Sequence, residues 1–236
     1  MRRPELVVGT LVGALTATFA MRLMAAGMRS EAAVLFSAFC IPLIYIFVAY
    51  LAATALGLDR WATLVSPTTP PKLIFRWAGY GLALAVGLQL FVPLVYGLIL
   101  LPFRPKEVLQ AARTTTVLWF RWPGMSPMVL RSLVGSPISE ELLFRGCLLS
   151  FYQAREVAPF RIGKYVLDGS NVLCSLAFAL FHLVNQRETV LHLTTVWVIS
   201  MFLGKAKKET GGLLAPVICH FLLNFVGHTA FQFVPK

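Results

Sequence analysis

Long runs of apolar residues constrain this chain more than any other feature. A helix of roughly 20 apolar residues crosses the hydrocarbon core of a bilayer. With 58% apolar and only 13% charged residues, a soluble fold could not bury so many such runs. The sequence therefore predicts an all-α, polytopic transmembrane helical bundle with about seven spans. By apolar length and breaker residues, these lie roughly at 6–26, 32–57, 76–101, 128–154, 170–186, 189–204 and 211–233.

A proline-rich connection at 102–127 precedes the fourth span. Between its prolines, residues 108–120 can form a short interfacial helix, because aromatic side chains beside arginines suit the depth of the lipid headgroups. This segment is also a candidate place for lateral entry of a substrate. We divide the chain into residues 1–127, with the N-terminal spans and the interfacial segment, and residues 128–236, with the candidate site. Both parts belong to one membrane domain.

The net charge of +11 fits a membrane protein better than a nucleic-acid-binding protein. The lysines and arginines lie mostly near span ends, where they meet anionic lipid headgroups. No basic run is interleaved with aromatic residues, so we exclude nucleic acid as a partner. The four cysteines lie inside apolar runs, without zinc-ligand or disulfide spacing. The compact loops favour a multi-pass protein of a prokaryotic plasma membrane.

Ionisable groups at membrane depth are costly and therefore need a reason. Of the ten acidic residues, only Glu140 and Glu141 fall inside a predicted span. Glu141 and Arg145 are four residues apart, so they share a helix face and can pair. Glu140 points about 100° away, and it can face a cavity instead. The preceding Ser136 and Pro137 resemble a helix start, with serine as the N-cap.

The four histidines all lie in the last three predicted spans. Phe178 and His182 share a face of the fifth span. On the last span, His220, Asn224 and His228 repeat every four residues and form a polar stripe on an otherwise apolar helix. His228 is close to the end of the apolar run, which favours an interfacial position, and the isolated His192 is interpreted as a structural residue.

These residues form three ordered motifs on three spans: Glu140-Glu141-x-x-x-Arg145, Phe178-x-x-x-His182 and His220-x-x-x-Asn224. The set resembles the CPBP (Abi) family, which includes the CAAX prenyl endopeptidases. The resemblance covers about the last 110 residues and implies an all-α intramembrane endopeptidase that uses a glutamate-activated water. Family members process prenylated CAAX tails, peptides linked to bacteriocins, or C-terminal sorting segments. A protein or lipidated peptide entering from the membrane is the implied substrate.

Peptide hydrolysis needs a base for water, a stabiliser for the oxyanion and an acid for the leaving amine. The resemblance and the Glu141–Arg145 spacing favour Glu140 as the base. We expect His182 to orient the water, and His220 and Asn224 to donate to the oxyanion. Glu141, Arg145 and Phe178 are the expected supporting residues.

Three alternatives remain open from the residues. No cofactor is expected, although Glu140, His182 and His220 could bind Zn²⁺ with an open position for water. The same Glu and His residues could form a proton or substrate relay in a transporter. A non-catalytic membrane scaffold is the third reading.

Overall fold

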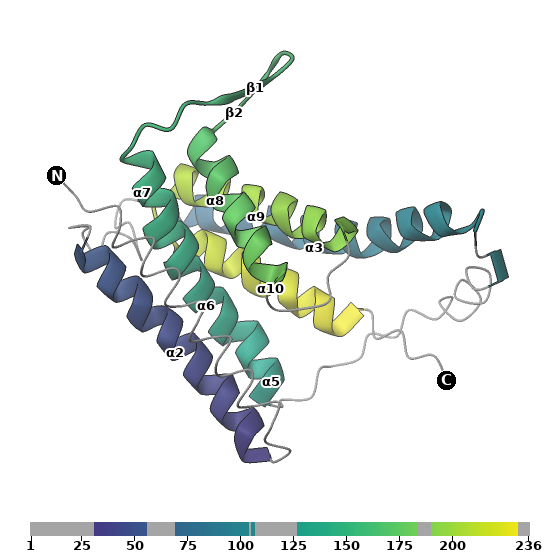
Figure 1. The fold of residues 1–236 in the computed structure, drawn as a ribbon, viewed down its shortest axis with the longest axis horizontal. Coiled ribbons are helices and arrows are strands. Elements are labelled where there is room, and N and C mark those ends of the chain that lie inside the picture. Colours follow the sequence, from purple (N-terminus) through teal and green to yellow (C-terminus); the bar gives the residue numbers. More distant parts are fainter. Residues whose placement is uncertain (1–30, 56–68, 104, 107–126, 184–189, 231–236) are drawn as a thin grey trace.

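A computed structural model describes residues 31–55, 69–103, 105–106, 127–183 and 190–230 (Figure 1). Within these ranges, helices occupy six of the seven predicted segments. The predicted first span at 6–26 and the predicted interfacial helix at 108–120 lie outside the described residues. The continuous helices are α2 (Glu31–Ala55), α3 (Pro71–Leu100), α8 (Gly169–Leu183), α9 (Val190–Thr210) and α10 (Leu214–Ala230).

One more helix, over residues 127–153 between α3 and α8, carries the two glutamates. We call it the site helix. It is a succession of α5 (Pro127–Leu130), η1 (Arg131–Gly135), α6 (Ser136–Glu141), η2 (Leu142–Leu149) and α7 (Ser150–Gln153), in which η1 and η2 have π-helical hydrogen bonding. In Figure 1 it lies alongside α2. Contacts with α2 and with α10 hold α6 between these two helices.

The helix start predicted at Ser136 and Pro137 is wrong, because the chain is already helical there. Gly135 has φ −62° and ψ −52°, and the N–H of Ser136 donates to the carbonyl of Arg131, five residues earlier. Proline lacks an N–H, and in an α-helix its ring clashes with the carbonyl four residues before it. The wider π-helical turn immediately before Pro137 accommodates this proline without ending the helix.

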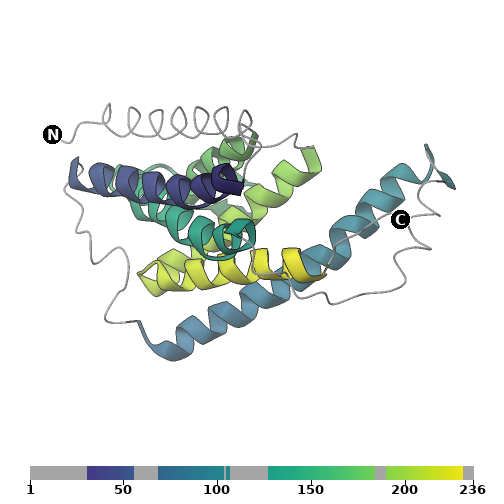
Figure 2. The same cartoon turned by 90° about the horizontal axis from the view of Figure 1, so that it is seen from below.

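Two apolar clusters join the helices. In one, α2, the site helix and α8 meet through aromatic rings, with ring centres 5.5 Å apart for Tyr45 and Phe181 and 4.9 Å apart for Phe144 and Phe178. In the other, Trp77 of α3 packs near α9 and α10. Figure 2 shows α10 lying along α3. The site helix, α8, α9 and α10 thereby converge on one region.

One element departs from the all-α prediction, although the described part is mostly helical. Strands β1 (Phe160–Ile162) and β2 (Tyr165–Leu167) form an antiparallel hairpin that joins α7 to α8. Gly163 opens its two-residue turn with a φ of +58°, which glycine adopts without strain. The strands are only three residues long, and such short runs leave little periodicity to detect.

The outer faces of α2 and α3 are apolar and exposed. Leu43 and Phe47 on α2, and Phe75, Phe91 and Leu94 on α3, are each at least 59% accessible. By length and composition, one helix in the described part of the chain, over Pro71–Phe91, can cross a membrane. The shorter apolar helices are Cys40–Leu51, Gly169–Leu183 and Leu214–His228.

Candidate active site

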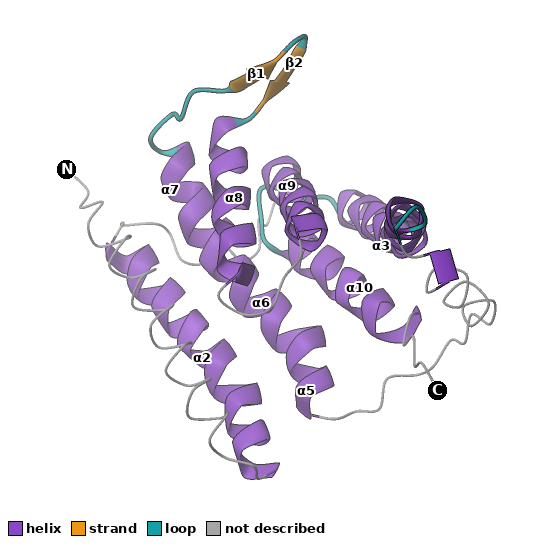
Figure 3. Cartoon of the chain, turned by 45° about the vertical axis from the view of Figure 1, so that its right-hand side comes forward, coloured by secondary structure: helices purple, strands orange, loops and turns teal. Residues whose placement is uncertain are grey.

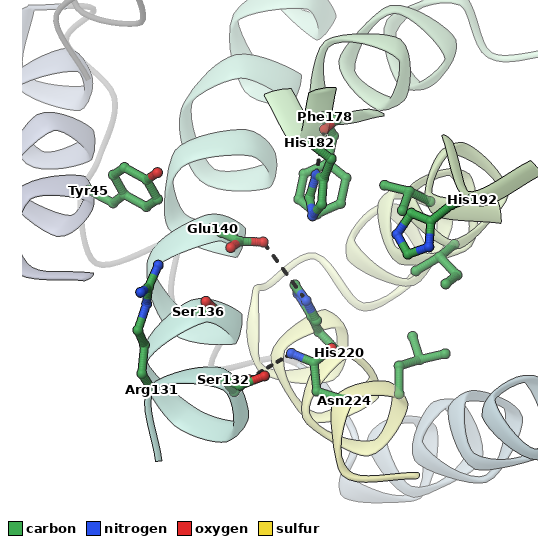
Figure 4. A pocket seen from close by; sticks show the side chains of 13 residues that line it. Tyr45, Arg131, Ser132, Ser136, Glu140, Phe178, His182, His192, His220 and Asn224 are labelled. Carbon is green, nitrogen blue, oxygen red and sulfur yellow. Dashed lines mark hydrogen bonds and ion pairs between the residues drawn. The ribbon is translucent and has the colours of Figure 1, made fainter. Parts of the chain in front are cut away.

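A cavity of about 410 Å³ opens where the site helix meets α8, α9 and α10 (Figure 4). Its wall combines a carboxylate, three imidazoles, a guanidinium and an amide with apolar side chains. The lining residues are Tyr45, Arg131, Ser132, Ser136, Glu140, Phe178, His182, His192, Val196, Ile199, His220, Leu223 and Asn224. The structure thus brings the four predicted catalytic residues, which come from three helices, to one cavity.

The two neighbouring carboxylates have different surroundings. Glu140 is 9% exposed and lines the cavity, whereas Glu141 is completely buried and does not line it. Successive residues on a helix point about 100° apart, so adjacent side chains enter different environments. Glu140 can therefore meet a molecule in the cavity, and Glu141 interacts only with protein groups.

Glu141 belongs to a buried network centred on Arg145. Arg145 Nη1 donates to Glu141 Oε1 at 2.8 Å, and neither side chain is exposed. Arg145 Nη2 donates to the backbone oxygen of Ser200 at 3.1 Å and to its Oγ at 2.6 Å. The guanidinium carbon also lies 4.5 Å from the ring centre of Phe178, in a cation–π arrangement. A buried charge requires such partners, so this network fixes the position of Glu141.

The ring of His220 lies between the two carboxylates. Nδ1 is 2.8 Å from Glu141 Oε1. Nε2 is 3.9 Å from Glu140 Oε2 (Figure 4). Because Glu141 Oε1 accepts from Arg145, we assign the imidazole hydrogen to Nδ1 as a second donor to this oxygen. In the neutral ring, Nε2 is then a hydrogen-bond acceptor near Glu140. The expected role of His220 as a donor to an oxyanion stays a prediction, and it would require a hydrogen on Nε2 as well.

His182 has the same tautomer for a different reason. Its Nδ1 lies 2.9 Å from the carbonyl oxygen of Phe178, which can only accept, so Nδ1 carries the hydrogen. The imidazole also packs on the Phe178 ring, with centres 4.6 Å apart. These contacts leave Nε2 as an acceptor on a side chain that lines the cavity. Phe178 therefore positions His182 as well as covering Arg145.

Asn224 and His228 both reach Ser132 on the site helix. Asn224 Nδ2 donates to the backbone oxygen of Ser132 at 2.7 Å, and His228 Nε2 lies 2.7 Å from Ser132 Oγ. An amide nitrogen carries two hydrogens, so this bond uses only one of the two donors of Asn224. Asn224 lines the cavity, whereas His228 is outside its lining.

Sequence reasoning missed the contribution of α9. His192, interpreted there as a structural residue, lines the cavity together with Val196 and Ile199, and Ser200 contacts Arg145. These positions follow helical spacing, at intervals of four, three and one residues, so they share one face of α9. This helical spacing is the sequence signal that would have indicated a contribution of α9 to the site. Tyr45 and Arg131 also line the cavity, and their positions depend on how the helices pack.

A zinc site does not fit the described residues well. Within them, no group of three His, Cys, Asp or Glu side chains is placed to hold a metal ion. Of the three residues considered for Zn²⁺, His220 uses Nδ1 for Glu141, and His182 uses Nδ1 for a backbone carbonyl. Because a zinc-binding histidine commonly binds through Nε2 while its Nδ1–H donates to an acceptor, these bonds do not themselves exclude zinc; what speaks against it is that no third ligand is grouped with them within the described residues.

Comparisons with known proteins show which proteins this chain is similar to. Residues 122–226 match the family model for Rce1-like proteins, described as type II CAAX prenyl endopeptidases. The chain is 28% identical over 114 residues to CAAX prenyl protease 2 of Arabidopsis thaliana, covering 42% of this chain and 34% of that protein. It is 27% identical over 105 residues to an uncharacterized 24.3 kDa protein of Escherichia coli, covering 44% of each. The matches thus span less than half of either relative, and no solved structure matches the chain.

Proposed function

Because residues 122–226 are a domain of the Rce1-like type II CAAX prenyl endopeptidase family, we propose that this protein is an intramembrane endopeptidase. It hydrolyses a peptide bond in the C-terminal or membrane-proximal part of its substrate, with Glu140 as the base. One observation carries the proposal. Glu140, His182, His220 and Asn224, which are distant in sequence, line the same cavity. The seven residues of the three motifs all lie within the matched range, 122–226.

The proposed setting is the lipid bilayer, with the helices as a multi-pass bundle. The apolar outer faces of α2 and α3 support it, since monomeric soluble proteins rarely expose large contiguous apolar patches. The apolar helix Pro71–Phe91 has the length to cross the hydrocarbon core. Hydrocarbon tails would cover these faces, and the buried charges of Glu141 and Arg145 would stay inside the bundle.

The reaction starts with a water molecule between Glu140 and His220. Their facing atoms are 3.9 Å apart, too far for a direct hydrogen bond, and a water oxygen between them can donate to both. As the water oxygen attacks the substrate carbonyl, one water proton passes to Glu140. The Nε2 atom of His220, or that of His182, accepts a hydrogen bond from the remaining O–H and aligns it.

The second part of the reaction needs a donor for the oxyanion. The remaining N–H of Asn224 suits this role, because its amide is anchored on Ser132 and lines the cavity. When the tetrahedral intermediate collapses, Glu140 returns its proton to the leaving nitrogen and the C–N bond breaks. Glu140 ends the cycle in its starting state. Glu141 and Arg145 take no proton in this scheme and act by holding His220.

The cavity also fits the chemistry of the proposed substrates. Beside its polar groups it presents Tyr45, Val196, Ile199 and Leu223, which can bind apolar side chains of an extended peptide. A C-terminal segment with aliphatic residues, carried into the bilayer by a lipid chain or a hydrophobic anchor, meets these requirements. A prenylated CAAX tail is one such segment, and C-terminal sorting segments and bacteriocin-related peptides are others.

The test uses the purified full-length protein in detergent with fluorogenic peptides ending in a CAAX sequence, prenylated or not. We expect cleavage that Glu140→Gln abolishes. Glu156→Gln, which changes an exposed glutamate outside the cavity, is the matched control and keeps full activity. Undiminished cleavage by Glu140→Gln would refute the assignment. If no peptide is cut, but proteoliposomes show a proton flux that depends on Glu140, the relay function is correct instead.

A further inference from the structure

The hairpin between α7 and α8 has two chemically different faces. Figure 3 shows it projecting beyond the ends of these helices. Its register pairs Phe160 with Leu167 and Ile162 with Tyr165, and directly paired residues of antiparallel strands lie on the same face. One face is therefore formed by four apolar or aromatic side chains. We call it the apolar hairpin face.

This face has little protein cover. Ile162 and Tyr165 are 63% and 64% exposed, Phe160 is 45% exposed, and only Leu167 is half-buried. An isolated two-stranded hairpin is marginally stable in water and usually needs a surface to pack against. Within the described residues, most of the apolar hairpin face is left uncovered, which makes it a candidate contact surface.

The charges around the hairpin indicate what chemistry this surface suits. Arg161 is on the opposite face, Lys164 is in the turn with its Nζ 5.4 Å from the Tyr165 ring centre, and Arg155 precedes the hairpin. Glu156 is the only acidic residue between 155 and 167, so the segment has a net positive charge. Aromatic and aliphatic side chains flanked by exposed cations are typical of elements at a membrane surface.

We propose that the apolar hairpin face inserts into the interfacial layer of a membrane that contains anionic lipids. Phe160, Ile162 and Tyr165 would enter the boundary between headgroups and acyl chains, while Arg161 and Lys164 contact lipid phosphates. The proposal rests on the membrane setting proposed above but not on proteolysis. It is also consistent with the sequence, because the hairpin lies between the predicted fourth and fifth spans, where the chain returns to the membrane surface.

A label on each face of the hairpin tests this contact. A Cys40→Ser background removes the one described cysteine that is not buried. An environment-sensitive fluorophore is attached at Ile162→Cys, on the apolar face, or at Val166→Cys, on the opposite face, and the full chain is reconstituted in phosphatidylcholine vesicles with or without phosphatidylglycerol. We expect shallow spin-labelled lipids to quench the Ile162 label several-fold more than the Val166 label. Phosphatidylglycerol should increase the difference, and a double Arg161→Gln, Lys164→Gln variant should abolish that increase.

A third label at Phe47→Cys, on the exposed face of α2, separates the two proposals. If lipid quenches the label at Phe47 but iodide in the water quenches the one at Ile162, the hairpin proposal is wrong and a protein partner becomes the candidate occupant. If lipid quenches neither label, the proposed membrane setting itself fails. Equal lipid quenching on both hairpin faces would also contradict insertion of one face.

Discussion

His220 Nδ1 lies 2.8 Å from Oε1 of Glu141, the same oxygen that accepts a hydrogen bond from Arg145. Glu141 thus interacts with the last helix and with its own helix at once. The bond determines which ring nitrogen of His220 is near Glu140, and the Arg145 network holds the carboxylate in place. The two adjacent glutamates therefore have different roles, and substituting each one should affect stability and peptide cleavage differently.

The first prediction compares Glu141→Gln with Glu140→Gln. Replacing Glu141 leaves the buried guanidinium of Arg145 without its counter-charge, and breaking a buried ion pair costs about 3–5 kcal/mol. The described ion-pair contact of Glu140, with His220 Nε2 at 3.9 Å, is too long for a hydrogen bond and involves no permanently charged partner, so Glu140→Gln should unfold near the wild-type temperature while losing peptide cleavage. Thermal unfolding in detergent measures the difference. Equal destabilisation by both substitutions would contradict the separate roles.

The second prediction concerns Asn224. Removing the proposed oxyanion donor with Asn224→Ala should lower kcat about 100–1000-fold and change KM little, because the proposed interaction forms mainly in the transition state. His228→Ala is a matched control, since His228 also binds Ser132 but does not line the cavity. Initial-rate kinetics of the two variants should differ accordingly. A similar loss of kcat in both variants would mean that Asn224 acts only through its structural contact with Ser132.

Ser200 gives a third prediction, for a residue outside the three motifs. Ser200→Ala removes the hydroxyl that accepts from Arg145 Nη2 at 2.6 Å, and a hydrogen bond to a charged group contributes about 1.5–3 kcal/mol. We expect a loss of that size in the free energy of unfolding, with reduced kcat as Glu141 and His220 become less well held. Thr194→Ala, at an exposed hydroxyl on the same helix, should change neither quantity. An unchanged stability of Ser200→Ala would show that the backbone oxygen of Ser200 suffices.

Most of the helical architecture could be predicted from apolar run length, because each run is a local property of the chain. The fourth predicted segment, 128–154, differs by one residue at each end from the helix over 127–153. The helix start at Pro137 was wrong, since composition does not reveal that a π-helical turn can absorb a proline. The hairpin was missed because strands of three residues carry too little periodic signal.

The candidate site divides in the same way into local and long-range parts. The Glu141–Arg145 pair follows from a spacing of four on one helix, and the structure contains it. The contacts of Glu141 with His220, and of Arg145 with Ser200, join residues 79 and 55 positions apart. They depend on which faces of α9 and α10 meet the site helix, and one sequence does not specify that packing. The hydrogen assigned to His220 Nδ1 follows only from these contacts.

The close approach of α8 and α9 leads to a fourth prediction. A Cβ atom at Gly204 would overlap the side chain of Asn171, whose Nδ2 donates to the Met201 carbonyl at 2.9 Å. Gly204→Ala must therefore push the helices apart or break this bond, and overpacking of this kind costs about 1–3 kcal/mol. Gly79→Ala on α3 is the matched control, because nothing lies within 4 Å of its Cβ. Thermal unfolding should show a loss of stability for Gly204→Ala but not for Gly79→Ala.

The last prediction uses Lys207, which lies beyond the predicted span 189–204. Its Nζ donates to Ser150 Oγ at 3.0 Å and to Gln153 Oε1 at 3.1 Å. Burial, and secondarily the positive charge of Lys208, lower the pKa of the Lys207 ammonium below its usual 10.5. The unfolded chain then binds this proton more tightly than the folded protein does. The cost of the buried charge is therefore fully present below the lowered pKa and disappears as pH rises towards 10.5.

Lys207→Met should accordingly be more stable than the wild type at about pH 7, and this advantage should shrink as the pH approaches the ordinary lysine pKa of about 10.4. Denaturant unfolding of both proteins across this range measures the difference and cancels groups that titrate equally in each. Lys205→Met is the control, because it removes a lysine charge from the same helix at a side chain that is 68% exposed, so no buried charge is lost. If the advantage of Lys207→Met stays constant with pH, the proton on Lys207 is held equally in both states, and the two hydrogen bonds fully offset its burial.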